Sequence, residues 1–247
     1  MRVTENPSDF FREYELKFLF PRSAYMFVHN YLEAVLNPDE FSSSRNFTLN
    51  YDTPELKAFQ EKRYSEISKT KVRLRWYLDT ATGKFSDKVY LEVKRRRANL
   101  RNKSRTPVDR DAALLTREMT AGRLDSREYA TPSFSEPELF DDRKFPIVCS
   151  SYSRKRFLCR TSAARVNLDS DLRIEAVDPT VVGPSATGAP SLDMPVIVEV
   201  KGTANGIPAE LAGLLGRPDQ FGFSKYEYII NNLCRLDRSE GIADEWI

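Results

Sequence analysis

The chain has 247 residues, and its 38 Lys and Arg side chains nearly cancel its 36 Asp and Glu side chains, which leaves a formal net charge of +2. This balance argues against a chain that binds nucleic acid or an anionic membrane through its overall charge, so any electrostatic function must be local. At this length an all-β barrel commonly forms one domain. We expect a single domain over residues 1–247, with a core at about 12–236.

The cysteines indicate the cellular compartment, and the single histidine limits the kinds of metal and catalytic site to be expected. Cys149, Cys159 and Cys234 are an odd number without zinc-like pairing, which fits a reducing compartment, so we expect the protein to be cytoplasmic. With His29 as the single histidine and no cysteine cluster, a histidine-rich zinc site or a Ser-His-Asp triad is not expected, and carboxylates must hold any metal. The N-terminus lacks an apolar signal core, and no stretch approaches the roughly 18 apolar residues of a membrane span.

Helical periodicity and turn residues predict the helices and loops in chain order. Helices are expected at 21–36, 55–64, 109–119, around 137–145, 209–215 and 225–236. The first ends at Asn37-Pro38. Residues 98–150 are expected to form helical cover. A flexible loop is expected at about 178–195, because this run is rich in Pro, Gly, Ser and Thr.

Strands are predicted mainly from alternation with a period of two. They are expected at 13–18, 46–52, 70–77, 88–97, 151–160, 163–169, 172–177 and 195–201. Because successive side chains of a strand point to opposite faces, Lys71, Arg73 and Arg75 share one face, opposite an apolar face. The same pattern groups Glu92 with Lys94, Glu199 with Lys201, Glu13 and Glu15 with Lys17, and Tyr152 with Arg154.

Each such strand, taken alone, fits an ordinary half-exposed antiparallel sheet. Seven of them in a chain with several helices favour apolar faces that pack outward on the helices and charged faces that meet inside a curled sheet. Like charges inside are costly, at about 4 kcal/mol for a pair 4 Å apart at a dielectric constant near 20. A polyanion with many phosphate oxygens supplies the counter-charge, and a divalent cation reconciles it with the glutamates.

Seven segments resemble, in order, the motifs of the VTC domain, the polyphosphate polymerase module of the vacuolar transporter chaperone complex. The first, Glu13-Tyr14-Glu15-Leu16-Lys17, looks like the Glu-x-Glu-x-Lys signature of the triphosphate tunnel metalloenzyme superfamily. The others are residues 71–77, 91–94, 152–154, Arg165, 198–201 and 223–226. The resemblance covers about residues 12–232.

The resemblance implies an α+β fold built on a closed antiparallel eight-stranded β-barrel, the triphosphate tunnel, with flanking helices. It implies that the catalytic residues are Lys17, Arg73, Arg75, Lys94, Arg154, Arg165 and Lys225. Phosphate-binding residues would be Lys201, Tyr152 and Ser224. Glu199 would be the leading ligand of Mn²⁺ or Mg²⁺, with Glu13 and Glu15 in support.

The implied activity is metal-dependent transfer of a phosphoryl group from ATP to a growing polyphosphate chain. An inorganic triphosphatase or polyphosphate hydrolase of the same superfamily, and a non-catalytic polyphosphate or nucleotide sensor, remain alternatives. Single-stranded nucleic-acid binding through Trp76, Tyr77 and Tyr90 is disfavoured by the interleaved glutamates, so nucleic acid is not an expected partner. The sequence leaves the oligomeric state open.

Two residue roles also stay open at this point. Lys225 could be a surface lysine at the start of a helix capped by Ser224, rather than part of the phosphate path. Glu92 could be a salt-bridge partner that neutralises the basic strands, rather than a metal ligand.

Overall fold

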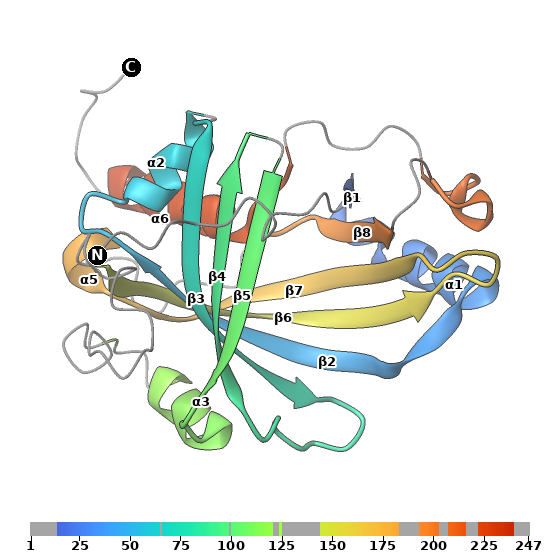
Figure 1. The fold of residues 1–247 in the computed structure, drawn as a ribbon, viewed down its shortest axis with the longest axis horizontal. Helices are drawn as coiled ribbons and strands as arrows, with labels where there is room; N and C mark the ends of the chain where they lie inside the picture. The colour runs from blue at the N-terminus through green and yellow to red at the C-terminus, as the bar shows by residue number, and fades with distance from the viewer. Residues whose placement is uncertain are drawn as a thin grey trace.

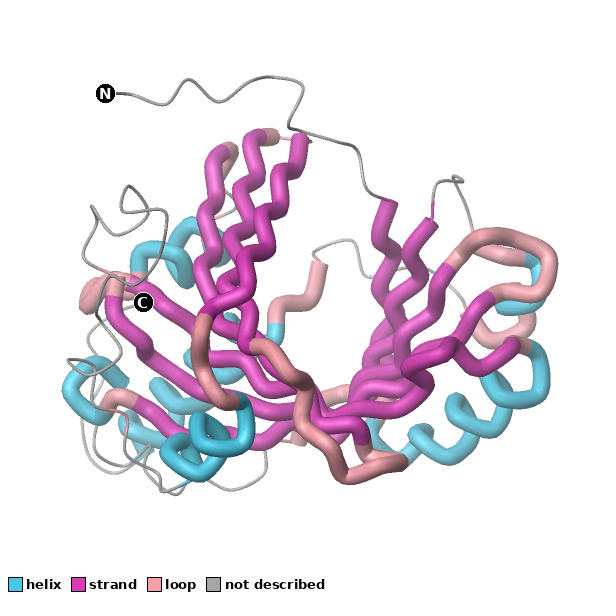
Figure 2. The backbone as a smooth tube through the Cα atoms, turned by 60° about the horizontal axis from the view of Figure 1, so that its bottom comes forward, coloured by secondary structure: helices cyan, strands magenta, loops and turns pink. Residues whose placement is uncertain are grey.

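The computed structural model describes residues 14–64, 66–98, 100–120, 124, 144–182, 193–202, 207–215 and 222–239. This part of the chain is an α+β fold, in which one antiparallel sheet of eight strands curls into a trough (Figures 1 and 2). The helices lie outside the trough (Figure 2).

The strands are long, and three of them, β2, β6 and β7, exceed twelve residues. They are β1 (Tyr14–Phe20), β2 (Asn37–Asp52), β3 (Ser68–Asp79), β4 (Val89–Arg97), β5 (Leu100–Val108), β6 (Phe145–Leu158), β7 (Arg165–Val177) and β8 (Val196–Gly202). The helices are α1 (Tyr25–Val35), α2 (Lys57–Arg63), α3 (Ala112–Thr120), α5 (Pro179–Val182) and α6 (Lys225–Ser239), with short 3₁₀ turns at Arg22–Ala24 and Ala209–Leu211. None of the described helices is long and apolar enough to cross a membrane.

The strand order is β1-β8-β7-β6-β2-β3-β4-β5, so β1 and β5 are the two edges of the sheet. Within the described residues no ladder of hydrogen bonds joins these edges, and they stand apart in Figure 2. The eight antiparallel strands are as expected, but the closed barrel is not confirmed. A side-chain contact does span the edges, from Arg101 Nη1 on β5 to Glu15 Oε2 on β1 at 3.8 Å.

The outward faces of the strands are apolar and pack against the helices, as the alternation predicts. Trp76 on β3 is fully buried and stacks on Phe47 of β2, with ring centroids 5.5 Å apart. Its indole nitrogen donates to Thr116 Oγ1 on α3 at 2.8 Å, which satisfies the polar end of a buried tryptophan. Trp76 therefore belongs to the core outside the trough and is turned away from its charged interior.

Two further apolar clusters attach the other helices. Ile229, Ile230 and Leu233 of α6 pack on β6 and β7, while Val28 and Leu32 of α1 pack on β6, β7 and β8. In Figure 1, α2, α5 and α6 lie at the left end of the sheet and α1 at the right end. With the outward faces buried in this way, the inward faces are free to be polar.

Helix α2 is fixed at one end of the trough by a buried carboxylate. Asp52, which is fully buried at the end of β2, accepts hydrogen bonds from the backbone nitrogens of Ala58 and Phe59 at 2.8 and 3.1 Å. It also accepts from Tyr226 Oη on α6 at 2.8 Å. One carboxylate therefore satisfies the first free N–H groups of α2 and ties that helix to α6.

The largest difference from the sequence analysis is β5, which lies in the region expected to be helical cover. Its sequence lacks the apolar alternation of the other strands, because an edge strand with one polar face can form without it. The expected strands 163–169 and 172–177 form the single strand β7, which bends at Asp171, where φ is 50°. Asn37-Pro38 begins β2 rather than a turn.

Two expected features lie partly outside the described residues. Of the helix expected around 137–145, the structure describes only Lys144, which is not helical, and Phe145, which begins β6. Of the loop expected at about 178–195, residues 179–182 form α5, and residues 183–192 lie outside the described residues.

Candidate functional site

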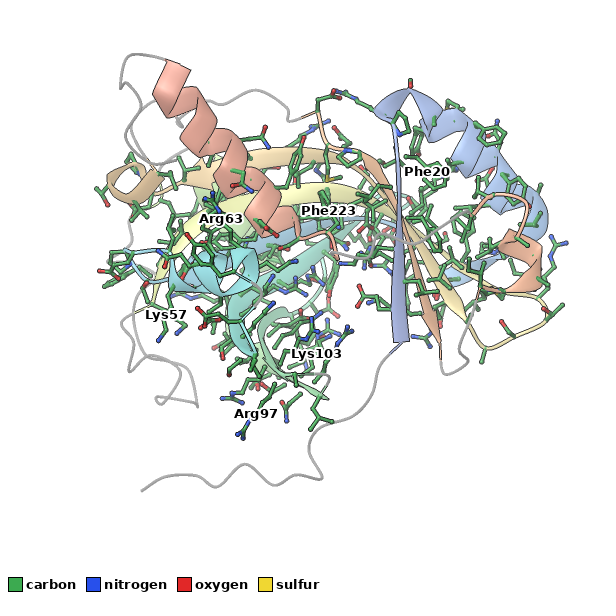
Figure 3. All side chains as sticks on the ribbon, turned by 90° about the horizontal axis from the view of Figure 1, so that it is seen from above. Phe20, Lys57, Arg63, Arg97, Lys103 and Phe223 are labelled. Atoms are coloured by element: carbon green, nitrogen blue, oxygen red, sulfur yellow. The ribbon has the colours of Figure 1, made fainter. Side chains whose placement is uncertain are left out.

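A cavity of about 330 Å³ lies inside the curled sheet, a volume in the range of small-ligand sites. Among the described residues that line it, fourteen are basic and two, Glu15 and Glu199, are acidic. The basic residues are Lys17, Lys62, Lys69, Lys71, Arg73, Arg75, Lys94, Arg95, Arg96, Arg101, Lys103, Arg154, Lys201 and Lys225. We call this the basic cavity. Figure 3 labels Lys103 on β5 and Phe223 before α6, both of which line it.

The strand register explains why these side chains meet. Residues paired across antiparallel strands point to the same face, and Lys71 pairs with Lys94 while Arg73 pairs with Glu92. On the opposite side of the cavity, Lys17 of β1 pairs with Glu199 of β8. The faces predicted from the period-two alternation are therefore the faces that the sheet turns inward.

Glu92 is held by cations on both of its oxygens. Arg73 Nε and Nη2 donate to Oε2 at 2.9 and 2.6 Å, and Lys103 Nζ lies 3.4 Å from Oε1. Burial alone would raise the pKa of this carboxyl, but Arg73, Arg75 and Lys103 together hold it below its usual range. With 1% of its surface exposed, Glu92 is a neutralising salt-bridge partner.

A second buried carboxylate, Asp169 on β7, holds the other side of the cavity in the same way. Arg154 Nε and Nη2 donate to its two oxygens at 2.5 and 2.6 Å, and Lys225 Nζ donates at 2.5 Å. Burial raises its pKa, but Arg154 and Lys225 outweigh burial and lower it. Asp169 was not among the predicted site residues, although it shares a face with Asn167 in the alternation of β7.

The two acidic residues of the basic cavity are also paired with cations. Glu199 accepts from Arg154 Nη2 at 2.9 Å and lies 3.8 Å from Lys17 Nζ. Glu15 lies 3.5 Å from Lys17 Nζ and contacts Arg101. Burial alone would raise the pKa of both carboxyls, but the nearby cations outweigh burial and lower it below its usual value. Both carboxyls therefore remain ionised near neutral pH.

The carboxylates near the cavity decide whether it can hold the predicted Mn²⁺ or Mg²⁺. The described residues contain no group of three or more His, Cys, Asp or Glu side chains that could hold a metal ion. Glu15 and Glu199 lie on neighbouring strands and line the same cavity, and Glu13 lies outside the described residues. Mg²⁺ is commonly bound by one or two carboxylates together with substrate phosphates. The two carboxylates therefore fit Mg²⁺ or Mn²⁺ if phosphate supplies the remaining ligands.

Several cations of the basic cavity lack a partner of opposite charge. Among the described residues, Lys94 and Lys201 make no hydrogen bond or ion pair, and Lys71 donates to the neutral hydroxyl of Ser224 at 3.1 Å. Arg73, then burial and Lys201, lower the pKa of Lys94. Lys94 and Lys201 come from opposite sides of the cavity, so the repulsion between them acts across it.

Tyr152 lies among the cations at the centre of the site. Its hydroxyl accepts hydrogen bonds from Arg75 Nη2 at 3.0 Å and from Asn46 Nδ2 at 3.3 Å. Lys225 Nζ stands 4.3 Å from the centre of its ring. Burial would raise the pKa of Tyr152, but Arg154 and Arg75 lower it to about 8.

The chain enters α6 beside the cavity. Gly222 has φ of 64°, a left-handed conformation that favours glycine, and the chain then passes Phe223, whose carbonyl accepts from Lys17 Nζ at 2.8 Å. Ser224 Oγ accepts from the backbone nitrogen of Glu227 at 3.5 Å, so Ser224 is placed as a helix cap. Lys225 lines the cavity rather than the outer surface, and Ser224 lines it too.

Most predicted site residues meet in the basic cavity. They are Lys17, Arg73, Arg75, Lys94, Arg154, Lys225, Lys201, Tyr152, Ser224, Glu199 and Glu15. Arg165 is not among the described lining residues. It is exposed at the first position of β7, where it pairs with Lys201.

Sequence reasoning missed the basic residues of β5 and several other basic residues that line the cavity. Arg101, Lys103 and Arg105 alternate along β5, and this period of two was available as a signal without apolar residues between them. Lys62, Lys69, Arg95 and Arg96 also line the cavity, because α2, β3 and β4 converge on it, and the local sequence pattern does not encode that convergence. Arg97, beyond the cavity at the end of β4, projects outward in Figure 3.

The family model described as the VTC domain matches residues 12–233. No curated protein matches the sequence.

Two solved structures illustrate the level of structural similarity. The PH1819 protein of Pyrococcus horikoshii OT3 has a TM-score of 0.47 and 12% identity, over 92% of this chain and 99% of that one. A protein of Bacillus halodurans described as a candidate adenylate cyclase has a TM-score of 0.45 and 14% identity, over 78% of this chain and 81% of that one.

Removing a charge from the basic cavity should stabilise the fold of the ligand-free protein. Burial, followed by Lys17 and Lys62, lowers the pKa of Lys71 from its ordinary 10.5 to about 8, so the folded state disfavours the charged form. We expect Lys71→Gln to raise the Tm of the ligand-free protein by about 2–6 °C at pH 7. The gain should be complete below pH 8 and should fade between pH 8 and 10.5. Thermal unfolding at pH 7 and pH 10 measures this.

The exposed Lys84 provides the matched control for Lys71. Lys84→Gln should leave Tm unchanged at both pH values. A Tm for Lys71→Gln that is equal to or below that of the wild type at pH 7 would contradict the repulsion described here.

Proposed function

The chain belongs to the VTC domain family, and on that premise we propose that it is a metal-dependent polyphosphate polymerase. It would transfer a phosphoryl group from a nucleoside triphosphate such as ATP to the end of a polyphosphate chain. The observation that carries the proposal is the basic cavity, in which fourteen of the described lining residues are cations and two are acidic. A linear polyanion with closely spaced charges is the ligand that such a lining favours.

The cations divide into two kinds according to what they can do to a phosphate. Arg73, Arg75 and Arg154 carry planar guanidinium groups, each held by a buried carboxylate, and can grip phosphate oxygens in a fixed orientation. Lys94 and Lys201 are point charges without ion-pair partners among the described residues, and they can follow a chain that moves. Transfer would then depend on positioning and charge stabilisation, with no covalent intermediate on the protein.

Glu199, with Glu15, would hold the Mn²⁺ or Mg²⁺, because both line the cavity and both are ionised. When bound, the ion supplies positive charge to the phosphate oxygens that the reaction makes more negative. The remaining steps fall to the side chains: Arg73 and Arg154 orient the donor phosphates, and Lys201 holds the growing chain.

The ionisation of the cavity carboxylates supports transfer to phosphate over transfer to water. An attacking water benefits from a base, and Glu15 and Glu199 are poor bases because nearby cations lower their pKa values. The terminal oxygen of a polyphosphate chain is already negatively charged near neutral pH and needs no base. We therefore place the polymerase ahead of the hydrolase.

The proposal also covers the cellular compartment, the ligands and the span of the domain. Cys149 and Cys159 are buried and unpaired, which supports a reducing compartment such as the cytoplasm. ATP and polyphosphate or triphosphate are the proposed ligands, handled by one tunnel domain over residues 1–247. Nucleic acid is disfavoured, because Trp76 is buried in the outer core.

The direct test is an incubation of the protein with ATP and Mn²⁺, followed by gel analysis of long-chain phosphate and an assay of released orthophosphate. We expect long chains, and we expect them to be lost on chelation of the metal. Arg73→Met should lower turnover by at least about 100-fold because it removes positive charge that stabilises the reacting phosphates, and Glu199→Gln should do the same because it removes the proposed metal ligand. The matched controls are Arg97→Met and Glu40→Gln, which are exposed outside the cavity. Retained turnover in Arg73→Met would contradict the site.

The hydrolase alternative has one observation in its favour, which is the pKa of Tyr152. Because that pKa is lowered to about 8, a phenolate could accept a proton from water, and hydrolysis would then rise as the pH passes 8. We expect the polymerase instead, so Tyr152→Phe should reduce chain synthesis by less than about tenfold, the usual cost of one or two hydrogen bonds. Its pH profile should stay unchanged. Orthophosphate release that rises through pH 8 and disappears in Tyr152→Phe would favour the hydrolase.

We also propose that the sheet closes into the expected barrel when polyphosphate is bound. The basic cavity has cations on both of its sides, and their repulsion disfavours contact between the edges β1 and β5 until a polyanion neutralises them. The contact between Glu15 and Arg101 already spans these edges.

Amide hydrogen exchange tests this closure. Tripolyphosphate should slow exchange in β1 and β5, because their unpaired edge amides would gain partners. The central strands β2 and β6 serve as the internal control, and little change is expected there. Tripolyphosphate binding with unchanged exchange at both edges would show that the sheet stays open.

A further inference from the structure

We propose that Asp169 is a positioning residue that holds Arg154 and Lys225 in place and limits how tightly the basic cavity binds its polyanion. The inference rests on the proposed function, and it concerns a residue that does not itself touch the ligand. Asp169 is fully buried and is not among the described residues that line the cavity. Its two partners both line it.

The geometry leaves the two cations little freedom. Arg154 is bound by both oxygens of Asp169, at 2.5 and 2.6 Å, so its guanidinium plane is fixed by a two-point contact. Lys225 shares one of these oxygens at 2.5 Å, although it comes from α6, 56 residues away in sequence. One carboxylate therefore aligns a strand residue with a helix residue.

The consequences extend to two other groups of the site. The same Nη2 of Arg154 that binds Asp169 also donates to Glu199, the proposed metal ligand, at 2.9 Å. Lys225 is held over the ring of Tyr152. A shift of Arg154 or Lys225 would therefore be felt at the metal ligand and at the centre of the cavity.

Asp169 also sets the local charge. Arg154 and Lys225 keep it ionised despite complete burial, so it removes one unit of positive charge from directly behind the cavity. Glu92 does the same on the other side, but it is shared among Arg73, Arg75, Lys103 and Arg105. Asp169 has only two cationic partners among the described residues, so its removal has the more local effect.

Opposite effects on binding and on turnover follow from these two roles. Loss of the negative charge strengthens the attraction for phosphate, which lowers Kd and slows product release. Loss of the two-point contact lets Arg154 move, and a displacement of about 1 Å can cost as much as 100-fold in rate. A side chain that only stabilised the fold would not separate Kd from kcat in this way.

The experiment compares Asp169→Asn, Asp169→Glu and the wild type by calorimetric titration with tripolyphosphate, by kcat and KM with ATP and Mn²⁺, and by Tm. Asp169→Asn should bind tripolyphosphate at least about threefold more tightly and lower kcat by about tenfold or more. Asp169→Glu keeps the charge, so its Kd should match the wild type, with an intermediate kcat.

The matched control is Asp52→Asn, because Asp52 is equally buried but accepts from the backbone of α2 and from Tyr226 rather than from the basic residues of the cavity. It should lower Tm and leave Kd unchanged. Should Asp169→Asn not fold, Asp169→Glu decides, since an unchanged kcat in that variant would overturn the positioning role.

The remaining outcomes also decide the matter. Asp169→Asn with wild-type Kd, or with tripolyphosphate binding lost, overturns the inference. If the wild type binds tripolyphosphate but produces neither long chains nor orthophosphate, the proposed function fails, and the titrations still decide whether Asp169 limits binding. If the wild type does not bind tripolyphosphate, both fail together.

Discussion

Repulsion among cations that face one another across an enclosed cavity is the constraint on which the rest of this structure depends. Lys94 and Lys201 come from opposite sides of the cavity, and their mutual repulsion helps to lower the pKa of Lys94. A pair of like charges 4 Å apart costs about 4 kcal/mol at a dielectric constant near 20, so the fourteen basic side chains among the described lining residues need compensation. The fold supplies part of it through Glu92 and Asp169, which sit behind the lining and bind the arginines.

The buried carboxylates neutralise only part of the positive charge. They bind and orient the arginines, while several lysines have no partner of opposite charge among the described residues. Arginine suits the first role, since its planar group can be fixed by two contacts and still present free N–H groups to a phosphate. Lysine suits the second. The result is a cavity in which Arg75 and Arg154 are fixed beside Tyr152 while Lys94 and Lys201 remain adaptable, and the excess of positive charge is what a phosphate chain would neutralise.

Such a lining is possible only because the apolar faces are buried elsewhere. Three apolar clusters lie outside the sheet: one includes Trp76 of β3 and packs on α3, one includes Ile230 of α6, and one includes Leu32 of α1. This arrangement leaves the interior of the curled sheet free for charge, and it leaves β1 and β5 as edges that side chains, rather than backbone hydrogen bonds, connect.

The sequence by itself determined which residues share a face, since a strand alternates with a period of two whatever its neighbours are. Lys71, Arg73 and Arg75 point inward as expected, and the order of the motifs indicated the family. Only the tertiary structure decided that β5 joins the sheet, that Arg165 is exposed and that Asp169 binds Lys225. These outcomes depend on register, strand curvature and contacts between distant segments, and no local pattern encodes them. For the same reason the sequence could not show that the sheet ends in two open edges.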